Sequence, residues 1–441
     1  MPSVSPAVPD HSPSDRSDRA GTGRPPQQSL WRDGDFRRLW AGETASQFGE
    51  QAGLTVLPLV AVLALGAGAE QLGVLRAVQQ VPILLCSLFV GVWVDRRRTR
   101  AVMVLTDLGR AVALVLVSVA GLLGVLGMPV LLVVALVLGV LSVVFDVAYQ
   151  ASLVRLVARD RLARGTTALE GSRSAAQIGG PALGGALVSL LSAPFAVTAA
   201  ACCFALSSLS IRGMRRTEAV PRQVAGEARM GRQIREGLRF VAGNAALRTV
   251  GICSAAFQFS FAGLMTVYLL FLPRTLHLSG AEVGLVLAAM GPGAVVGSVL
   301  AGTLPRRLGH GAVLVVSAAL GDGVMLCLPA VHGSAAATVP LLMAANFVFG
   351  LFGQLVDVTV VVVRQAVTPV RLQGRVVATI NFVGMGTTPL GSLLGGWLAG
   401  QWGLRTGLLV TAAGLLLSPL IMALSPLARL GRSLPSSDRD G

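Results

Sequence analysis

Apolar runs of about 20 residues, each long enough to cross a hydrocarbon core of roughly 30 Å as a helix, recur along nearly the whole chain. In lipid every backbone N–H and C=O must find its hydrogen-bond partner within the chain, which leaves α-helices or closed β-barrels. These runs are too long for barrel strands and lack their alternation of apolar and polar residues. The sequence therefore predicts an all-α polytopic membrane protein, and a content of 53% hydrophobic and 13% charged residues agrees with that class.

Twelve transmembrane helices are expected, near 39–64, 72–94, 101–125, 129–153, 169–190, 195–212, 246–272, 280–304, 311–330, 338–362, 376–399 and 405–427. An even number of spans places both termini on the same side. All 36 basic residues are arginine, and most fall in the tails and loops of that side, against Arg274 and Arg405 on the other and Arg76 at a span entrance. The positive-inside rule therefore predicts cytoplasmic termini and a place in the cell membrane. The net charge of +15 comes from these short loops and does not indicate nucleic-acid binding.

The spans divide the chain into five segments. Residues 1–35 and 428–441 are polar, so both are expected to be disordered cytoplasmic tails, while six-helix bundles are expected over 36–212 and 246–427. Between the bundles, residues 213–245 carry apolar residues at helical spacing with arginines among them: Ile234, Leu238, Val241 and Ala245. This pattern predicts a basic amphipathic helix on the lipid headgroups, and a plain tether between the halves fits it equally well.

The two halves align on each other at a constant offset of 211 residues. The offset relates residues of the same kind in five spans: Gln47 and Gln258, Phe48 and Phe259, Gly73 and Gly284, Gly139 and Gly350, Asp146 and Asp357, Gly180 and Gly391, and Gly184-Gly185 and Gly395-Gly396. A register that holds over five spans without a gap indicates a duplicated unit of six spans with parallel topology. Duplicated bundles of this kind place a substrate site near the membrane midplane, between the halves.

Two motifs resemble those of the major facilitator superfamily. The loop after the second span has Gly91, Asp95, Arg96 and Arg100 at the spacing of the motif G-x-x-x-D-R-x-x-x-R, and residues 177–185 of the fifth span resemble the Gly/Pro-rich motif of drug:proton antiporters. Segments around 36–40, 107–110, 146–151 and 236–240 look most like the subgroup of macrolide and enterobactin exporters. The resemblance covers residues 36–427 and implies two six-helix bundles that exchange protons for a small molecule.

The sequence departs from that family in two places. Many antiporters of the superfamily have an arginine in the fourth span that assists proton coupling, whereas Asp146 is the ionisable residue there in this chain. In the second-half copy of the loop motif, Arg306 occupies the acidic position. Both departures bear on the coupling mechanism and leave the expected fold unchanged.

Ionisable residues deep in a span are costly in lipid and are therefore functional candidates. Glu50 lies near the centre of the first span, and Glu43 lies two helical turns earlier on the same face. Burial disfavours the charged form of a carboxyl group, so such a group is suited to carrying a proton. Glu50 is the first candidate for proton coupling, and a structural ion-paired role is the alternative. Glu43, nearer the cytoplasmic surface, and Asp322 in the ninth span are further candidates.

The loop after the second span is expected to act as a gate. Asp95, with Arg96 and Arg100 beside it, is suited to docking against a helix N-terminus or an arginine, and the start of the eleventh span near Arg375 is a candidate partner. The alternative is that these charges only set topology.

Three further sets of residues are expected to have conformational roles. Asp146 and Asp357 are related by the repeat, and they would either form part of a gate or line an inner vestibule. Asp107 and Arg110 are three residues apart and should form an ion pair within one helix. Close packing and a bend are expected in the fifth span, which the resemblance extends to a seal between the halves, at Gly180, Pro181, Gly184 and Gly185.

The mid-membrane residues of the first and seventh spans are candidates for the substrate cavity. Hydrogen bonds and aromatic surface for an amphipathic substrate would come from Gln47, Phe48, Gln258 and Phe259, unless these residues only pack the core. The five cysteines and four histidines have no metal-ligand spacing, and no ATP-binding loop occurs. No catalytic residue, metal or cofactor is therefore expected, and an ion gradient or the substrate's own gradient would supply the energy.

These features predict a secondary active efflux transporter that exports small lipophilic molecules, such as drugs or antibiotics, by proton antiport through alternating access. A dedicated exporter of one secreted metabolite, such as a siderophore or a self-made antibiotic, is an alternative. A non-transporting membrane receptor or scaffold is an alternative of another class. The expected partners are a small-molecule substrate, protons and membrane lipids, with a monomeric chain.

Overall fold

The computed structural model describes residues 33–95, 97–156, 162–191, 193–214, 227–333, 335–369 and 372–431, and all regular structure within them is helical. The first half contains α1 (Gly34–Leu63), α2 (Ala69–Asp95), α3 (Thr99–Leu122), α4 (Met128–Leu156), α5 (Leu162–Leu190) and α6 (Ala193–Arg212). After α7 (Glu227–Gly243), the second half contains α8 (Ala245–Thr275), α9 (Gly280–Ala288), α10 (Met290–Ala301), α11 (Leu304–Leu308), α12 (His310–Val324), η2 (Met325–Ala330), α13 (Ala335–Val367), α14 (Gln373–Gly386), α15 (Thr388–Trp402), α16 (Leu404–Leu415), α17 (Leu417–Leu424) and η4 (Pro426–Arg429). Nearly all of the two predicted tails lies outside the described residues.

Each predicted span falls on one helix or on two or three successive helical segments. Nine of these segments in the described part of the chain are long and apolar enough to cross a membrane. The other three, α1, α2 and α5, have 30, 27 and 29 residues, which is also long enough to cross a membrane. They pack among the nine, so twelve helical segments build the transmembrane part.

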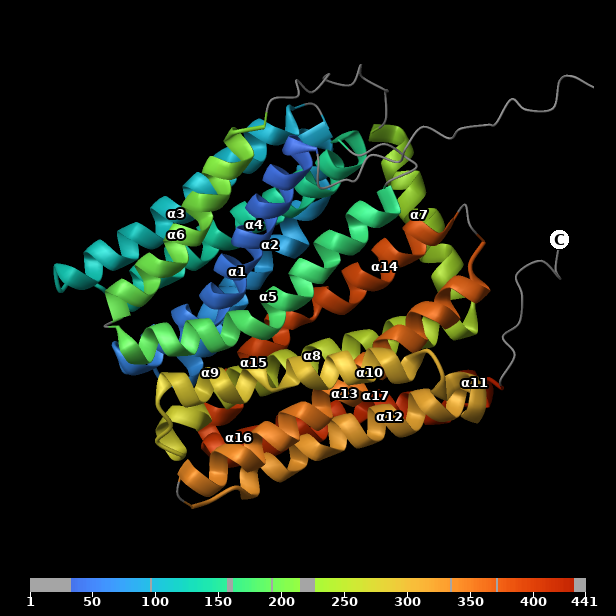
Figure 1. Ribbon diagram of the computed structural model, residues 1–441. Helices are drawn as coiled ribbons and strands as arrows, with labels where there is room; N and C mark the ends of the chain where they lie inside the picture. Colours follow the sequence, from blue (N-terminus) through green and yellow to red (C-terminus); the bar gives the residue numbers. More distant parts are fainter. Residues whose placement is uncertain are drawn as a thin grey trace, which may run out of the picture.

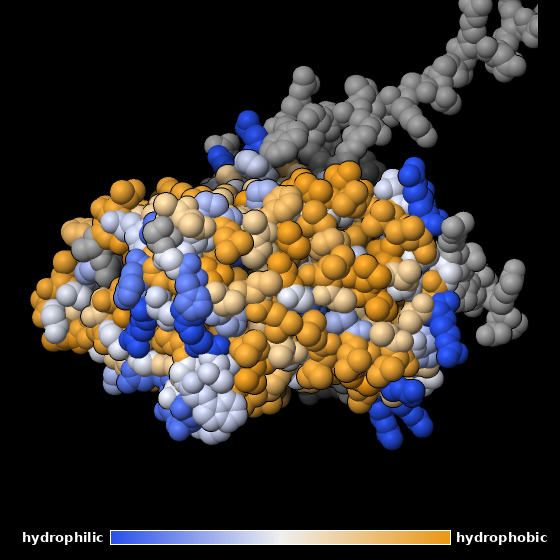
Figure 2. Space-filling view, turned by 90° about the horizontal axis from the view of Figure 1, so that it is seen from below, coloured by the Kyte–Doolittle hydropathy of each residue, from blue (hydrophilic) through white to orange (hydrophobic). Residues whose placement is uncertain are grey.

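The twelve segments form two bundles (Figure 1). In the first bundle, α1 packs against α5 and α6, α3 against α4 and α6, and α2 against α4. In the second, α8 packs against α14, α15 and α16, and α13 against α10 and α12. Figure 2 shows a largely apolar band across the molecule with hydrophilic residues toward its two ends, as a bilayer requires. The predicted fold class is confirmed.

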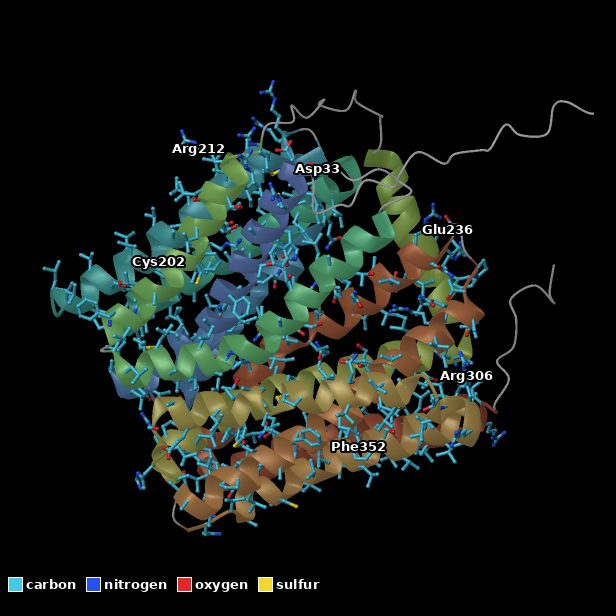
Figure 3. All side chains as sticks on the ribbon, viewed as in Figure 1. Asp33, Cys202, Arg212, Glu236, Arg306 and Phe352 are labelled. Carbon is cyan, nitrogen blue, oxygen red and sulfur yellow. The ribbon has the colours of Figure 1, made fainter. Side chains whose placement is uncertain are left out.

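Charged residues distinguish the two ends of the bundles. Figure 3 shows four labelled residues along one end of the molecule, where α1 begins and α6 ends: Asp33, Arg212, Glu236 and Arg306. We name this end of the bundles the arginine-rich end, and the other end of the bundles the opposite end. Here Arg38 donates a hydrogen bond to the carbonyl of Gly213, and Arg100 donates one to the carbonyl of Arg212. These cations satisfy carbonyl groups that the end of α6 leaves free.

The internal repeat is visible in contacts within the bundles. A Cβ added at Gly139 of α4 would lie 2.3 Å from the carbonyl oxygen of Gln79 in α2. A Cβ added at Gly350 of α13 would lie 2.1 Å from the carbonyl oxygen of Met290 at the start of α10. Both members of the second pair follow those of the first by 211 residues. The same close approach of two backbones therefore occurs at equivalent places in both halves.

The same offset relates two of the helix contacts that join the bundles. Helix α2 packs on α15, where a Cβ added at Gly73 would lie 3.1 Å from the Cα of Gly396. Helix α9 packs on α5, where a Cβ added at Gly284 would lie 2.9 Å from the Cα of Gly185. Glycine at these positions lets the helices of opposite bundles touch backbone to backbone.

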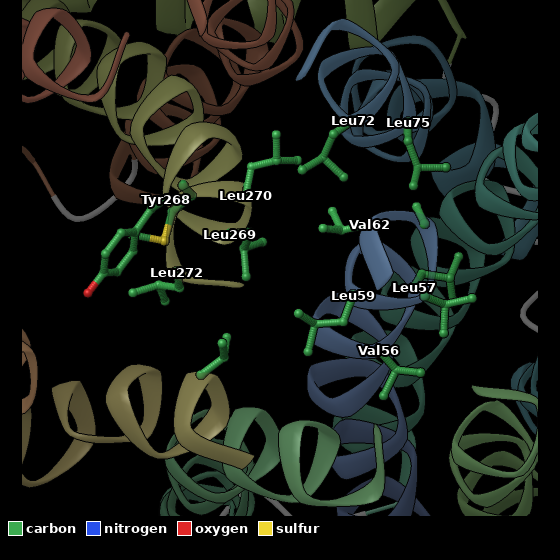
Figure 4. Close-up of a cluster of buried hydrophobic side chains, with 14 of the residues drawn as sticks. Val56, Leu57, Leu59, Val62, Leu72, Leu75, Tyr268, Leu269, Leu270 and Leu272 are labelled. Carbon is green, nitrogen blue, oxygen red and sulfur yellow. The ribbon is translucent and has the colours of Figure 1, made fainter. Parts of the chain in front are cut away.

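Apolar side chains from both bundles gather near these contacts, toward the opposite end. Figure 4 shows part of this cluster, with Val62 and Leu72 from the first bundle and Leu269 and Leu270 from α8. All four are at most 5% exposed. The cluster therefore excludes water between the bundles at this level.

A set of hydrogen bonds also joins the bundles at the opposite end. Arg274, in the last turn of α8, donates to the carbonyl oxygens of Gly66 and Ala67, each at 2.7 Å. Gln401 of α15 donates to Glu70 of α2 at 3.2 Å. We name these five residues the latch. The bundles are thus closed against each other at the opposite end.

Helix α7 lies at the arginine-rich end, where the sequence predicts an amphipathic helix, and packs on α14 and α8. Arg375 of α14 donates a hydrogen bond of 2.6 Å to Glu236 of α7. Val241 is buried and Leu238 is exposed. The side chains of 227–234 lie outside the described part of the structure.

Candidate functional site

A cavity of about 990 Å³ lies between the bundles. Its wall extends from Val250 and Arg364, near the arginine-rich end, to Arg76 and Leu269, nearer the latch. In Figure 1 the ribbons of the two bundles diverge toward the arginine-rich end. A space of this size accommodates a drug-sized ligand.

Three aromatic rings lie nearly parallel in the wall of this cavity. Phe257 and Phe261 of α8 have ring centroids 5.5 Å apart, and Phe349 of α13 lies 5.6 Å from Phe261 and 6.3 Å from Phe257. All three residues line the cavity, and we name them the aromatic wall. Such a wall offers a planar apolar ligand a large contact area.

Four charged residues line the cavity. Arg76 of α2 and Arg364 of α13 each have a buried Nε without a hydrogen-bond partner. Asp322 of α12 is 5% exposed, and Asp357 lies on α13 two turns before Arg364. Within the part of the chain that the structure describes, none of the four forms an ion pair. Unpaired charges at this depth are costly, so they favour a ligand that compensates them.

A second polar cluster lies inside the first bundle, around the fully buried Arg110 of α3. Its guanidinium donates hydrogen bonds to Asp107, to Ser46 Oγ at 2.9 Å, to Ser142 Oγ at 3.3 Å and to Glu50 Oε2 at 3.4 Å. Asp107 and Arg110 form the ion pair within α3 that their spacing predicts.

Aromatic rings lie close to this guanidinium. The Cζ of Arg110 is 4.4 Å from the ring centroid of Phe145 in α4 and 4.4 Å from that of Phe204 in α6. A planar delocalised cation stacks on aromatic faces while its edge donates hydrogen bonds, which an ammonium group does less well. Side chains from α1, α3, α4 and α6 therefore hold one cation.

Two buried acids lie in this cluster. Asp107 is fully buried and also accepts a hydrogen bond from Ser207 of α6. Glu43 is 2% exposed and accepts a hydrogen bond of 2.8 Å from Gln47, while its second oxygen, Oε2, has no partner among the described residues. Ion pairing and hydrogen bonding thus stabilise Asp107 more completely than Glu43.

Two further acids extend the cluster. The side chain of Glu50 is 25% exposed, and its one ion pair is the 3.4 Å contact with Arg110. Asp146 of α4 interacts electrostatically with Glu50, Arg110 and Arg173 of α5. We name the four acids, Glu43, Glu50, Asp107 and Asp146, the carboxyl network. Its acids outnumber the one fully buried cation among them.

The equivalent region of the second bundle is built differently. The offset of 211 residues carries Glu50 to Phe261 and Arg110 to Gly321. Phe261 belongs to the aromatic wall, and Gly321 also lines the cavity. The second half thus lacks the charged pair of Glu50 and Arg110, although Asp146 of the network keeps an acidic counterpart, Asp357.

The comparison with known families agrees with this architecture. Residues 28–439 match the family described as transmembrane secretion effector, within the major facilitator superfamily. The chain belongs to this family.

Characterised relatives of this major facilitator transporter include multidrug efflux pumps. The multidrug efflux pump Tap of Mycolicibacterium fortuitum is 27% identical over 360 residues, which cover 79% of this chain and 85% of that protein. Tap of Mycobacterium tuberculosis (strain ATCC 25618 / H37Rv) is 28% identical over 400 residues, which cover 86% of this chain and 90% of that protein. The transporter is thus homologous to multidrug efflux pumps.

Solved structures share the fold. A bacterial homologue of the human lysosomal transporter Spinster, in an inward-facing and occupied conformation, has a TM-score of 0.72 and 13% identity, covering 91% of this transporter and 98% of that chain. A bacterial homologue of the iron transporter ferroportin, in an inward-facing state, has a TM-score of 0.71 and 18% identity. The match covers 90% of this transporter and 99% of that chain. At these identities the likeness concerns the fold alone.

The four residues predicted for the substrate cavity lie in different parts of this transporter, and only one of them lines the cavity. Gln258 lines the cavity. Gln47 donates a hydrogen bond to Glu43 of the carboxyl network, and Phe48 packs on α5, where a Cβ added at Gly179 would lie 3.1 Å from its ring. Phe259 touches α15 through its backbone, because its carbonyl oxygen would lie 1.9 Å from a Cβ added at Gly391.

The predicted proton-coupling residues also lie in two different places. Glu50 and Glu43 lie in the carboxyl network, whereas Asp322 lines the cavity. The repeat-related acids divide in the same way, because Asp146 lies near Glu50 and Asp357 lies on the cavity wall.

The predicted gate is only partly described. Arg100 contacts the end of α6, and Arg375 contacts Glu236 of α7. The side chain of Asp95, and Arg96 altogether, lie outside the described residues.

The Gly/Pro-rich segment of α5 contacts two other helices. A Cβ added at Gly180 would lie 2.3 Å from the Cβ of Gln51, and one at Gly184 would lie 2.9 Å from the carbonyl oxygen of Ala52, both in α1. On the facing side Gly185 meets α9, and Pro181 lines the cavity. This segment therefore links α1 to the second bundle.

Sequence reasoning missed Arg76 and the aromatic wall. The sequence indicates a span entrance for Arg76, whereas in the structure this residue lies about two helical turns inside α2. For the aromatic wall, the repeat offers a signal, because it aligns Phe261 with a charged residue, Glu50. Among the described residues, no group of His, Cys, Asp and Glu is arranged to hold a metal ion.

Proposed function

We propose that this transporter exports small lipophilic, drug-like molecules in exchange for protons, by alternating access to the cavity between its bundles. The homology to Tap multidrug efflux pumps supports export and lipophilic substrates. The apolar lining and the closed latch support alternating access, since a rocking motion would open one end as it closes the other. A place in the subgroup of macrolide and enterobactin exporters is the finer form of this proposal.

The orientation is part of the proposal. The arginine-rich end faces the cytoplasm by the positive-inside rule, so both termini are cytoplasmic and the cavity accepts substrates from the inner side of the cell membrane. The chain acts as a monomer in the lipid bilayer, because its cavity is formed by two bundles of one chain.

The observation that carries proton exchange is the imbalance of charge around Arg110. Arg110 is the one fully buried cation beside these four acids, of which Glu43 and Asp107 are buried, and an uncompensated buried carboxylate is costly. Protons therefore occupy part of the carboxyl network. We assign the exchanged proton to Glu50, because its side chain is partly exposed and its contact with Arg110 is long.

The packing of α1 provides a route from this proton to the substrate. Glu50 precedes Gln51, which lines the cavity and contacts Gly180 of α5. Helix α5 in turn contacts α9 of the second bundle through Gly185. A proton on Glu50 removes its attraction to Arg110 and so changes how α1 packs against the helices that join the bundles.

Transport in everted membrane vesicles tests the proposal. Accumulation of a lipophilic fluorescent drug should require a proton gradient and stop when an ionophore collapses it. The substitution Glu50→Gln should abolish gradient-driven accumulation, whereas Glu170→Gln, at an exposed position of α5, should leave it unchanged. Accumulation that persists without the gradient would reject proton antiport, and a complete lack of transport with intact protein would favour a receptor or scaffold.

A further inference from the structure

The unpaired charges of the cavity indicate which substrates it prefers, an inference that rests on the proposed export function. We propose that the deep part of the cavity binds amphipathic zwitterions. Arg76 receives the anionic group, Asp322 receives the cationic group, and the aromatic wall of the same cavity contacts the apolar body of the ligand.

Arg76 is suited to binding an anion because no described residue forms an ion pair with its guanidinium. It lines the cavity, its Nε is buried without a hydrogen-bond partner, and no carboxylate pairs with it. A guanidinium binds a carboxylate or phosphate through two parallel hydrogen bonds, which makes it the preferred side chain for such groups. A ligand with an anionic group therefore supplies the partner that the protein leaves out.

Asp322 lies on the facing bundle at a similar depth. Arg76 follows the start of α2 by seven residues, and Asp322 precedes the end of η2 by eight, so each lies roughly 10–15 Å from the opposite end of the bundles. Asp322 is 5% exposed and lines the cavity with Ser317 and Gly321 of the same helix. Its carboxylate therefore meets a ligand at about the level of Arg76.

Among the described residues of the second bundle, no cation forms an ion pair with Asp322. Arg364, on the same cavity wall, follows the start of α13 by 29 residues and so lies roughly 40 Å from the opposite end. Arg274 and Arg405 donate instead to backbone carbonyls at the opposite end. A cationic group of the ligand is the remaining partner.

The two charges do not pair with each other in this structure, although both line one cavity. The aromatic wall and the apolar side chains of Met265 and Leu269 lie along the same cavity. A lipophilic monocation satisfies Asp322 and the aromatic wall but leaves Arg76 unpaired. A lipophilic anion leaves Asp322 unpaired. A zwitterion with a planar apolar body satisfies all three, so it should bind most tightly.

Three fluorescent xanthene dyes of nearly the same shape test this order. One is a rhodamine with a free carboxylate and a delocalised cation, the second is its methyl ester, which keeps only the cation, and the third is fluorescein, which keeps only negative charge. Binding to the purified full-length transporter in detergent is measured by fluorescence polarisation. We expect the zwitterion to bind about tenfold more tightly than either relative, because each lost charge removes one charge-assisted contact.

Each substitution should remove the preference of the transporter for the zwitterionic dye over one of the other two dyes. Arg76→Gln should make the zwitterion and its methyl ester bind equally, and Arg76→Lys should restore part of the difference. Asp322→Asn should make the zwitterion and fluorescein bind equally. Glu170→Gln and Arg306→Gln, at exposed positions outside the lining of the cavity, serve as controls that keep the preference. Size-exclusion profiles confirm that each variant is folded.

The outcomes separate this inference from the proposed function. If the dyes bind with equal affinity, or if the preference survives Arg76→Gln and Asp322→Asn, zwitterion recognition is wrong while a drug-binding cavity stands. If none of the three dyes binds the folded protein, the cavity is not a drug site, and both proposals are overturned.

Discussion

Glu50 of α1 and Phe261 of α8 occupy equivalent positions in the two halves, 211 residues apart, yet one pairs with a buried arginine and the other stacks on two aromatic rings. The duplicated unit has therefore diverged at a place where function is expected. The first bundle is suited to holding protons and the second to contacting the substrate, and the predictions below test these roles separately.

Replacement of Arg110 should destabilise the first bundle. Arg110→Ala leaves Asp107 buried without its cation, which costs about 3–5 kcal/mol. Arg110→Lys should rescue little of this loss, because an ammonium group cannot stack on Phe145 while donating to several acceptors along its edge. Thermal unfolding in detergent measures the effect, with Arg173→Lys at an exposed position as the control. A lysine variant as stable as the original would show that the guanidinium shape is unimportant.

Loss of one ring from the aromatic wall should weaken drug binding. Phe261→Ala removes the ring that stacks on both others, and aromatic contacts of this kind contribute about 0.5–1.5 kcal/mol, or roughly 2- to 12-fold in affinity. Phe261→Tyr should bind nearly as tightly as the original. Titration of a planar fluorescent drug gives the dissociation constants. Phe382→Ala, at a residue that is 56% exposed, should not change them.

A methyl group at the joint between α5 and α9 should impair closure at the opposite end. In Gly185→Ala the new Cβ would lie 2.2 Å from the carbonyl oxygen of Gly280, which the backbone must relieve by moving apart. Spin labels at Leu191 and His277, which flank this joint, should report a longer mean distance, and transport should fall. Gly171→Ala on the same helix has open space around its Cβ and provides the control. Unchanged label distances in Gly185→Ala would contradict the assigned role of this contact.

Breaking the latch should favour opening at the opposite end. Arg274→Gln weakens two hydrogen bonds of 2.7 Å to Gly66 and Ala67, which should shift the equilibrium between the closed and open states by about tenfold. A cysteine placed at Leu269, in a variant without the native cysteines, should then react faster with a membrane-impermeant reagent added outside the cell. Arg306→Gln, at the arginine-rich end, should leave this rate unchanged. Equal rates in all three proteins would mean that the latch does not hold this end closed.

The sequence predicts the helices well because a run of apolar residues and its polar flanks are local features. The largest difference is at α5, which begins at Leu162 rather than near 169, because its polar first turns extend beyond the apolar run. The repeat also predicts topology, since equivalent glycines such as Gly139 and Gly350 make equivalent contacts.

The candidate site was predictable only where its contacts are local. The Asp107–Arg110 pair follows from a spacing of three residues within one helix. The contacts of Arg110 with Ser46 and Phe204 join residues 64 and 94 positions away, and no periodicity in one helix indicates them. Arg76 was misplaced for a related reason, because hydropathy locates the end of a span but does not show which neighbour a side chain faces.

The glycine contacts between the bundles have a consequence for the symmetry of the chain. Gly73 meets Gly396 and Gly284 meets Gly185, and the offset makes Gly284 the counterpart of Gly73, and Gly396 the counterpart of Gly185. Each half therefore presents the same patch to the other, as two identical subunits do across an isologous two-fold interface. The joint between the halves therefore has the geometry of a symmetric homodimer, although both halves belong to one chain.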